Sequence, residues 1–293
     1  MRVEVPLRWG DLDAQGHVNN ARYIDYLQDA RADFLHELGI ADLLSRGFTV
    51  VSNQIEYRSP VFFSHEPLAV DIAVAELDAL SVTLAYHLYQ YDREVAVART
   101  TLCGFDLATR ARRPLPLRAL ETFAGLVEPT ETLREIEWMD MNERAKVDKM
   151  RVRWTDMDAY GHVNNAIIFD YLQEGRITFT AAPLRGAGPA VDPDHLWFLV
   201  RQDVEYLNPV SFRMAPYIVR TGIARLGRTS LTFSSQVDDP VSGVVCSRAV
   251  AVAVFADATG KPTPLTDDLR AEFGVYLLTG ADERAVVGAT PEG

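Results

Sequence analysis

RWGDLDAQGHVNNARYIDYLQDAR (residues 8–31) and RWTDMDAYGHVNNAIIFDYLQEGR (residues 153–176) are two copies of one motif, a constant 145 positions apart (153 − 8). Each copy begins with D-x-D-x-x-G-H-V-N-N and continues into a stretch whose apolar residues recur at spacings of three and four. This spacing places the apolar side chains on one face of a helix. Each motif is therefore expected to form a loop that leads directly into an amphipathic helix.

The repeat extends well beyond the motif. QIEYRSPV (residues 54–61) matches DVEYLNPV (residues 203–210), and RPLPL after Arg112 resembles KPTPL after Gly260. A match over most of both halves indicates a duplicated domain rather than a short-period repeat. The boundaries are expected at residues 1–127 for the first domain, 128–146 for a charged linker, 147–280 for the second domain and 281–293 for a tail.

Both halves have the same predicted order of elements. A short strand (residues 3–9 and 149–154) precedes each motif, and a series of strands with polar breaks between them follows each helix. These strands are expected at residues 48–57, 68–77, 81–91, 95–105, 197–206, 217–226, 230–237 and 244–255. One helix followed by hairpin-connected strands favours an α+β fold, in which an antiparallel sheet carries a helix on one face.

Composition predicts a soluble protein that resides in the cytoplasm. Hydrophobic residues make up 48% of the 293 residues and charged residues 24%, which is typical of globular domains. No apolar run approaches the roughly 20 residues that span a bilayer, and the N-terminal residues lack the pattern of a signal peptide. Cys103 and Cys246 lie in apolar strand-like runs, so both are expected to be buried, reduced thiols.

The charge pattern restricts the class of partner. A formal net charge of −12 disfavours nucleic acid as a partner, because such a surface repels polyphosphate. An anionic ligand would need a local basic group. Arg110, Arg112 and Arg113 form the one tight basic cluster in the sequence, and they are either such a group or a solvated loop.

Two interpretations of the motif involve no catalysis. In the first, Asp11, Asp13 and Gly16 form a turn and an asparagine (19 or 20; 164 or 165) caps the helix, but a turn does not require the His and both asparagines twice. In the second, the D-x-D-x-x-G pattern binds calcium. The Glu that an EF-hand needs at loop position 12 is replaced by Arg22 in the first copy and by Ile167 in the second. A zinc site is disfavoured because no second His or Cys lies nearby in the sequence.

Hydrolysis explains more of the motif. A carboxylate just before a helix lies beside free backbone N–H groups and the positive end of the helix dipole. Such amides stabilise an oxyanion that develops on a carbonyl, while the carboxylate attacks that carbonyl or activates water against it. His17 or His162 can assist proton transfer, and the asparagine side chains can orient water or substrate.

With its two copies of D-x-D-x-x-G-H-V-N-N, each before an aromatic-containing helix, the chain resembles the hotdog-fold thioesterases of the 4-hydroxybenzoyl-CoA thioesterase-like group. The resemblance implies two tandem hotdog domains, each a curved antiparallel sheet wrapped around a long central helix. Hotdog domains of this group pair into dimers with a site at each interface. A duplicated chain would accordingly form an intrachain pseudo-dimer, which could associate further into a homo-oligomer.

The resemblance also assigns site residues. The second Asp of the motif, Asp13 or Asp158, is the expected nucleophile or general base, whereas Asp11 and Asp156 are expected to form the turn. His17 and His162 have either a chemical role or a loop-ordering role. Oxyanion and substrate contacts are expected from the residues that follow, with the backbone amides of the first two in each copy as donors: Val18, Asn19, Asn20, Val163, Asn164 and Asn165.

The tandem-hotdog acyl-ACP thioesterases are also similar, with one departure. Their motif has an Asn where this chain has Gln15 in the first copy and Tyr160 in the second. This difference puts their mechanism in doubt here and separates the two halves. Gln15 could hold a water molecule, whereas Tyr160 could close its pocket or stack on an acyl group.

The sequence therefore predicts an acyl thioesterase that hydrolyses an acyl-CoA, or alternatively an acyl-ACP, without a metal or redox cofactor and without a membrane partner. The rival hypothesis is a non-catalytic acyl-binding protein, against which the intact Asp13 and Asp158 argue. A hotdog dehydratase is a further alternative, but its Asn-Pro-Leu-His signature is absent.

Overall fold

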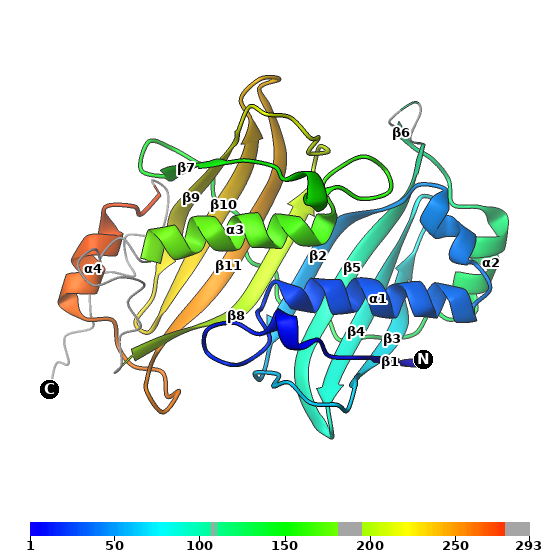
Figure 1. The fold of residues 1–293 in the computed structure, drawn as a ribbon, viewed down its shortest axis with the longest axis horizontal. Helices are drawn as coiled ribbons and strands as arrows, with labels where there is room; N and C mark the ends of the chain where they lie inside the picture. The colour runs from blue at the N-terminus through cyan, green and yellow to red at the C-terminus, as the bar shows by residue number, and fades with distance from the viewer. Residues whose placement is uncertain (107–108, 110, 181–194, 279–293) are drawn as a thin grey trace, which may run out of the picture. The chain divides into compact units, whose positions relative to one another are not determined.

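The computed structural model describes residues 1–106, 109, 111–180 and 195–278. The chain divides into two compact units, and in each of them helices accompany an antiparallel sheet (Figure 1). The first unit contains Met1–Glu135, Arg153–Phe169 and Asp203–Phe212, and the second contains the rest of the described chain. The second copy of the motif thus belongs to the first unit. The domain boundaries drawn from the sequence remain a prediction, and the expected tail at 281–293 lies outside the described residues.

The sheet of the first unit has the strand order β1-β3-β4-β5-β2, and every pair whose register is resolved in it is antiparallel. The end of β8, from Asp203, lies next to β2, where the Gln54 side chain donates to the Asp203 carboxylate at 3.5 Å. A short strand, β6, pairs with the end of β5. The bounds are Arg2–Val5 for β1, Phe48–Tyr57 for β2, Leu68–Leu77 for β3, Ser81–Gln90 for β4, Arg93–Asp106 for β5, Ala111–Arg112 for β6 and His195–Tyr206 for β8.

Helix α1 (Arg22–Glu37) contacts β1 and β3 of this sheet and runs across it in Figure 1. Its buried face follows the predicted spacing of three and four and includes two tyrosines and one arginine. The buried residues of α1 are Tyr23, Ile24, Tyr26, Leu27, Ala30, Arg31, Phe34 and Leu35. Helix formation therefore follows from the amphipathic pattern, while the buried arginine does not.

The second unit repeats this arrangement. Its strands follow the order β8-β11-β10-β9-β7, with β7–β9, β9–β10 and β10–β11 antiparallel. Helix α3 (Asn165–Thr180) begins in the first unit and continues in the second, where Gly175 lies close to Val219 of β9. The remaining bounds are Lys146–Met150 for β7, Tyr217–Leu226 for β9, Ser230–Asp239 for β10 and Val244–Asp257 for β11.

Two short helices follow the proline-containing segments. Helix α2 (Leu117–Ala124) comes after RPLPL and helix α4 (Asp267–Gly274) after KPTPL, and the chain then forms a parallel bridge back to β3 or β9. These bridges pair Val74 with Val127 and Ile223 with Leu277. The repeat therefore extends to both helices, although the sequence analysis did not predict them.

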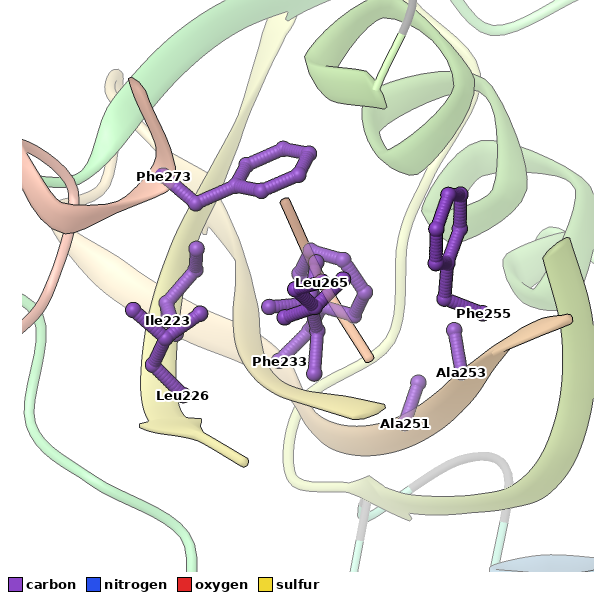
Figure 2. Close-up of a cluster of buried hydrophobic side chains, with 9 residues drawn as sticks. Ile223, Leu226, Phe233, Ala251, Ala253, Phe255, Leu265 and Phe273 are labelled. Carbon is purple, nitrogen blue, oxygen red and sulfur yellow. The ribbon is translucent and has the colours of Figure 1, made fainter. Parts of the chain in front are cut away.

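The core of the second unit is an aliphatic and aromatic cluster, shown in Figure 2. It packs residues of β9, β10 and β11 against Phe273 of α4, and Trp197 of β8 touches it at the rim. Cys103 and Cys246 are both buried and free, as predicted. Burial raises the pKa of the Cys246 thiol to about 11. Among the described residues, no helix is long and apolar enough to cross a membrane.

Candidate active site

The first copy of the motif closes a tight loop just before α1. The Asp13 amide donates to the His17 carbonyl at 2.8 Å, and the Gly16 amide donates to the Asp13 carbonyl at 3.1 Å. An antiparallel bridge between Leu12 and Val18 joins the two ends of this loop. Gly16 has φ +81°, in the left-handed region that favours glycine, as the turn interpretation predicted.

The second copy has the same backbone. The Asp158 amide donates to the His162 carbonyl at 2.7 Å, and the Gly161 amide donates to the Asp158 carbonyl at 3.1 Å. Gly161 has φ +75°, and Met157 bridges Val163. Both copies thus hold their second Asp on the same rigid turn.

This turn also fixes the carboxylate of each second Asp. Asp13 Oδ1 accepts from the Gln15 amide at 2.8 Å, and Asp158 Oδ1 accepts from the Tyr160 amide at 2.8 Å and from the His162 amide at 3.2 Å. Each carboxylate is therefore oriented through one of its oxygens.

The histidines differ between the copies. His17 Nδ1 lies 3.3 Å from Asp13 Oδ2, and His17 Nε2 lies 3.1 Å from Gln15 Oε1. The His17 ring also meets the edge of Phe62, with 6.4 Å between ring centroids. Within the described part of the chain, the His162 ring has no comparable contact. The structure therefore brings Asp, His and Gln together in the first copy only.

The asparagines order the start of each helix. Asn19 Oδ1 accepts from the Ala21 amide at 2.9 Å, and Asn164 Oδ1 accepts from the Ala166 amide at 3.0 Å. Of the two asparagines proposed as caps in each copy, the first makes this bond. Their side chains are consequently committed to the backbone.

The predicted oxyanion donors need a correction. The amides of Val18 and Val163 donate to the carbonyls of Val61 and Val210 at 2.8 Å. The amides of Asn19 and Asn164 donate in the same way to the carbonyls that begin each motif, those of Asp11 and Asp156, at 2.9 Å. None of these amides is available to a substrate, so their assignment as donors is wrong.

The next position in each copy is different. Among the described residues, the backbone amide of Asn20, two residues before α1, and that of Asn165, the first residue of α3, donate no hydrogen bond. N–H groups in the first turn of a helix have no intrahelical partner. The backbone therefore leaves these two amides open to an acceptor on a ligand.

Two tyrosines hold these positions in place. Tyr57 Oη donates to the Asn20 carbonyl at 3.0 Å, and Tyr206 Oη donates to the Asn165 carbonyl at 2.9 Å. Both tyrosines belong to the repeated E-Y-x-x-P-V block, which the sequence analysis did not assign to the site. Its repetition in both halves, after each motif and its helix, was the signal that could have assigned it.

Around the second copy a polar network surrounds Tyr206. Asn53 is buried, its Nδ2 donates to Tyr206 Oη at 3.0 Å, and its Oδ1 accepts from Thr100 Oγ1 at 2.7 Å. Asn165 Nδ2 donates to Gln28 Oε1 of α1 at 3.4 Å. Burial raises the pKa of the Tyr206 hydroxyl, which therefore stays protonated and donates.

Tyr160 connects the second loop to the segment that follows α1. Its hydroxyl donates to the Leu44 carbonyl, in the short 3₁₀ helix Ala41–Ser45 that follows α1. Burial raises the pKa of Tyr160, and the negative charge of Asp158 raises it further. Gln15, at the matching position, instead lies against His17.

The first Asp of each motif has a structural role. Asp11 Oδ2 accepts from Tyr26 Oη of α1 at 2.7 Å, and Asp156 Oδ2 accepts from the Arg153 amide at 2.7 Å. No group of three or more His, Cys, Asp or Glu side chains that could bind a metal is present among the described residues. Of the basic cluster, Arg110 lies outside the described residues, and Arg113 donates to the Arg46 carbonyl.

Known proteins resemble this chain in sequence and in fold. Long-chain acyl-CoA thioesterase FadM from Escherichia coli (strain K12) is 31% identical over 115 residues, which cover 38% of this chain and 86% of FadM. Two solved structures are similar along most of the chain. An acyl-ACP thioesterase from Bacteroides thetaiotaomicron VPI-5482 is 14% identical, with a TM-score of 0.65, and covers 87% of this chain and 97% of its own. The 12:0-ACP thioesterase from Umbellularia californica is 12% identical, with a TM-score of 0.64, and covers 88% of this chain and 97% of its own.

At such low identity the two structures show a shared fold alone. The chain has two tandem hotdog domains, and its sequence family, together with its likeness to FadM, identifies it as a thioester hydrolase. The chain belongs to the thioesterase-like superfamily, whose sequence profile matches residues 7–124 and 152–273. The expected family and α+β fold are thereby confirmed.

Proposed function

We propose that this protein hydrolyses acyl-CoA thioesters to the free acid and CoA, with Asp13 and Asp158 each acting at its own site. The observation that carries the proposal is the orientation of both carboxylates by backbone amides, on a loop that leads into a helix and has an open N–H at Asn20 or Asn165. A carboxylate and an oxyanion donor on one short loop are what thioester hydrolysis requires.

The proposed reaction uses the Asp carboxylate as a general base. It removes a proton from a water molecule whose oxygen attacks the thioester carbonyl carbon. The oxygen of the tetrahedral intermediate carries the negative charge and accepts a hydrogen bond from the Asn20 or Asn165 amide. When the intermediate collapses, the C–S bond breaks and the thiolate leaves with the electron pair. The carboxylate then releases its proton.

The tyrosine anchors contribute positioning. An oxyanion donor is effective only if it is held where the charge develops, because reorienting a dipole during the reaction costs free energy. Tyr57 and Tyr206 hold the carbonyls of the two donor residues, so the backbone is restrained at the peptide group that follows each donor N–H before substrate arrives.

CoA is proposed as the carrier on electrostatic grounds. The net charge of −12 would repel an acidic carrier protein over its whole docking surface, whereas CoA presents a few phosphates that a local group can bind. The carrier protein remains the alternative that direct assays distinguish.

The test measures thiol release from a panel of acyl-CoAs by wild type, Asp13→Asn, Asp158→Asn and the double variant. Loss of a general base lowers the rate by about 10²- to 10⁴-fold, so the double variant should fall by that factor. Each single variant should retain the activity of the other site. Asp29→Asn, an exposed residue of α1 paired with Arg8, is the matched control and should leave the rate unchanged.

Three results would overturn parts of this proposal. Full activity in the double variant would exclude both carboxylates. Turnover of acyl carrier protein esters by a wild type that leaves every CoA ester intact would replace the carrier. A single turnover in H₂¹⁸O that places the label in Asp13 or Asp158 would make the carboxylate a nucleophile instead of a base.

A further inference from the structure

Arg31 is the most unusual polar residue near the second copy of the motif. It lies in the middle of α1 and has only 5% of its surface exposed. Arginine is almost never this buried unless it is paired, since removing its charge from water costs several kcal/mol. The fold therefore places a cation where a partner is needed.

No such partner is found within the described chain. Other arginines of this region form ion pairs: Arg8 with Asp29 at 3.0 Å and Arg22 with Asp25 at 2.6 Å. Among residues 1–106, 109, 111–180 and 195–278, Arg31 has no hydrogen bond, ion pair or stacked ring. Its guanidinium group carries five N–H donors that remain available for a ligand.

The surroundings of Arg31 are those of the Asp158 site. Gln28, one turn earlier on α1, accepts from the Asn165 side chain at 3.4 Å. The positive charge of Arg31 lowers the pKa of the Tyr160 and Tyr206 hydroxyls, against the larger effect of burial, so its charge lies near both. One of these tyrosines anchors the proposed oxyanion donor, and the other follows Asp158 by two residues.

We propose that Arg31 binds a carboxylate at the far end of the acyl chain, so that the Asp158 site selects ω-carboxyacyl thioesters. This inference rests on the proposed function, because it assigns the acyl group of the same reaction. A planar guanidinium binds a carboxylate through two parallel hydrogen bonds, which a single buried arginine can supply. A CoA phosphate carries more charge and would need further donors at the surface.

The second half supplies a matched residue. Arg176 occupies the position of Arg31 in the repeat (31 + 145), but it is half-buried and already interacts with another group. Arg176 therefore lacks the two properties that make Arg31 a candidate. Arg176→Met is the control substitution for Arg31→Met.

The test compares glutaryl-CoA with pentanoyl-CoA, and adipyl-CoA with hexanoyl-CoA, in the Asp13→Asn background that isolates the second site. A charge-assisted hydrogen bond is worth about 1.5–3 kcal/mol, so Arg31→Met should raise KM for the dicarboxylic esters roughly 10- to 100-fold. The monocarboxylic esters should be unaffected or improved. Arg31→Lys should recover part of the loss, and unfolding curves should establish that each variant folds.

A second arm identifies the anion. The same acyl groups are presented as N-acetylcysteamine thioesters, which carry no phosphate. If Arg31→Met still discriminates between glutaryl and pentanoyl esters, the anion is on the acyl group as proposed. If Arg31→Met impairs all CoA esters equally and no N-acetylcysteamine ester, the arginine binds the carrier phosphate and the proposal is wrong.

Failure of the inference can be separated from failure of the proposed function. Hydrolysis of pentanoyl-CoA and glutaryl-CoA that does not depend on Arg31 would overturn the inference and leave the thioesterase intact. If no CoA ester is hydrolysed, binding of glutarate against pentanoate by calorimetry still tests Arg31. Tighter binding of glutarate, lost in Arg31→Met and retained in Arg176→Met, would support the inference alone, and equal binding would overturn it.

Discussion

The two copies of the motif share a backbone but differ in the side chains that complete it. Both loops close with the same hydrogen bonds, and both place a glycine at positive φ. In the first, Asp13 contacts His17, which in turn contacts Gln15. In the second, Asp158 has no contact with a histidine ring among the described residues, and Tyr160 instead reaches the Leu44 carbonyl.

This contrast shows that the loop backbone is the same in the two copies, whereas the side chains around it differ. The loop is fixed by residues within the motif itself, so two copies of the motif give two copies of the loop. The surroundings come from distant residues that have diverged. Asn53 of β2 holds Tyr206, whereas Gln202, at the matching position of β8, has a buried Nε2 without a hydrogen bond among the described residues. The two loops thus share a backbone but differ in the side chains around them.

Tyr206→Phe should have the largest effect of the substitutions that probe this contrast. Its hydroxyl donates to the Asn165 carbonyl and accepts from Asn53, so its removal breaks two hydrogen bonds, one of them to a buried asparagine. We expect a loss of about 1–3 kcal/mol in the free energy of unfolding, measured by urea denaturation. Tyr57→Phe, which removes the matching donor to the Asn20 carbonyl, is the paired variant in the first copy. An unchanged free energy of unfolding in Tyr206→Phe would contradict the network around Tyr206.

His17→Gln should lower activity at the first site by roughly tenfold, which is less than the 10²- to 10⁴-fold typical of the group that transfers the proton itself. The physical reason is that His17 is the only ring within reach of Asp13 Oδ2 in the described chain, at 3.3 Å. The measurement is kcat/KM in the Asp158→Asn background. His162→Gln in the Asp13→Asn background is the matched variant and should change little. A tenfold loss in both would mean that the histidines have one role in the two copies.

Gly16→Ala and Gly161→Ala should each cost about 1 kcal/mol of folding stability, since an alanine in the left-handed region strains its backbone. A Cβ at either position would meet nothing within 4 Å, so strain is the only expected cost. Gly10→Ala, at an equally open position without positive φ, should be neutral. Thermal unfolding distinguishes these outcomes, and a neutral result at residue 16 alone would show that the two loops are unequal in strain.

Much of the fold could be predicted from the sequence, because alternation and breaks are local signals. The predicted bounds of β2, β3 and β9 agree with the structure, and both central helices begin near their asparagine caps. Helices α2 and α4 were not predicted. They are only eight residues long, and packing against the sheet stabilises them more than their own sequence does.

The site was predicted less completely, for a physical reason. Sequence spacing identified the Asp and Asn residues, but it could not show that the Val18 and Asn19 amides already donate to carbonyls. It also gave no sign that Arg31 is buried, since an arginine ends both copies of the motif. Hydrogen-bond occupancy and burial depend on residues far away in the chain, which a local pattern does not contain.

Tyr160→Phe should have the smallest effect on stability, about 0.5–1 kcal/mol, because the Leu44 carbonyl that loses its donor belongs to an exposed residue and water can replace it. Tyr91→Phe, an exposed tyrosine, is the control and should cost nothing measurable. The functional effect should be larger than the structural one. Tyr160 fixes the loop after Asp158 against the segment that follows α1, so its loss should broaden the acyl range at the second site and leave the first unchanged. An unaltered acyl profile in the Asp13→Asn background would mean that Gln15 and Tyr160 are interchangeable, and the difference between the two sites would then rest on their histidines and on Arg31.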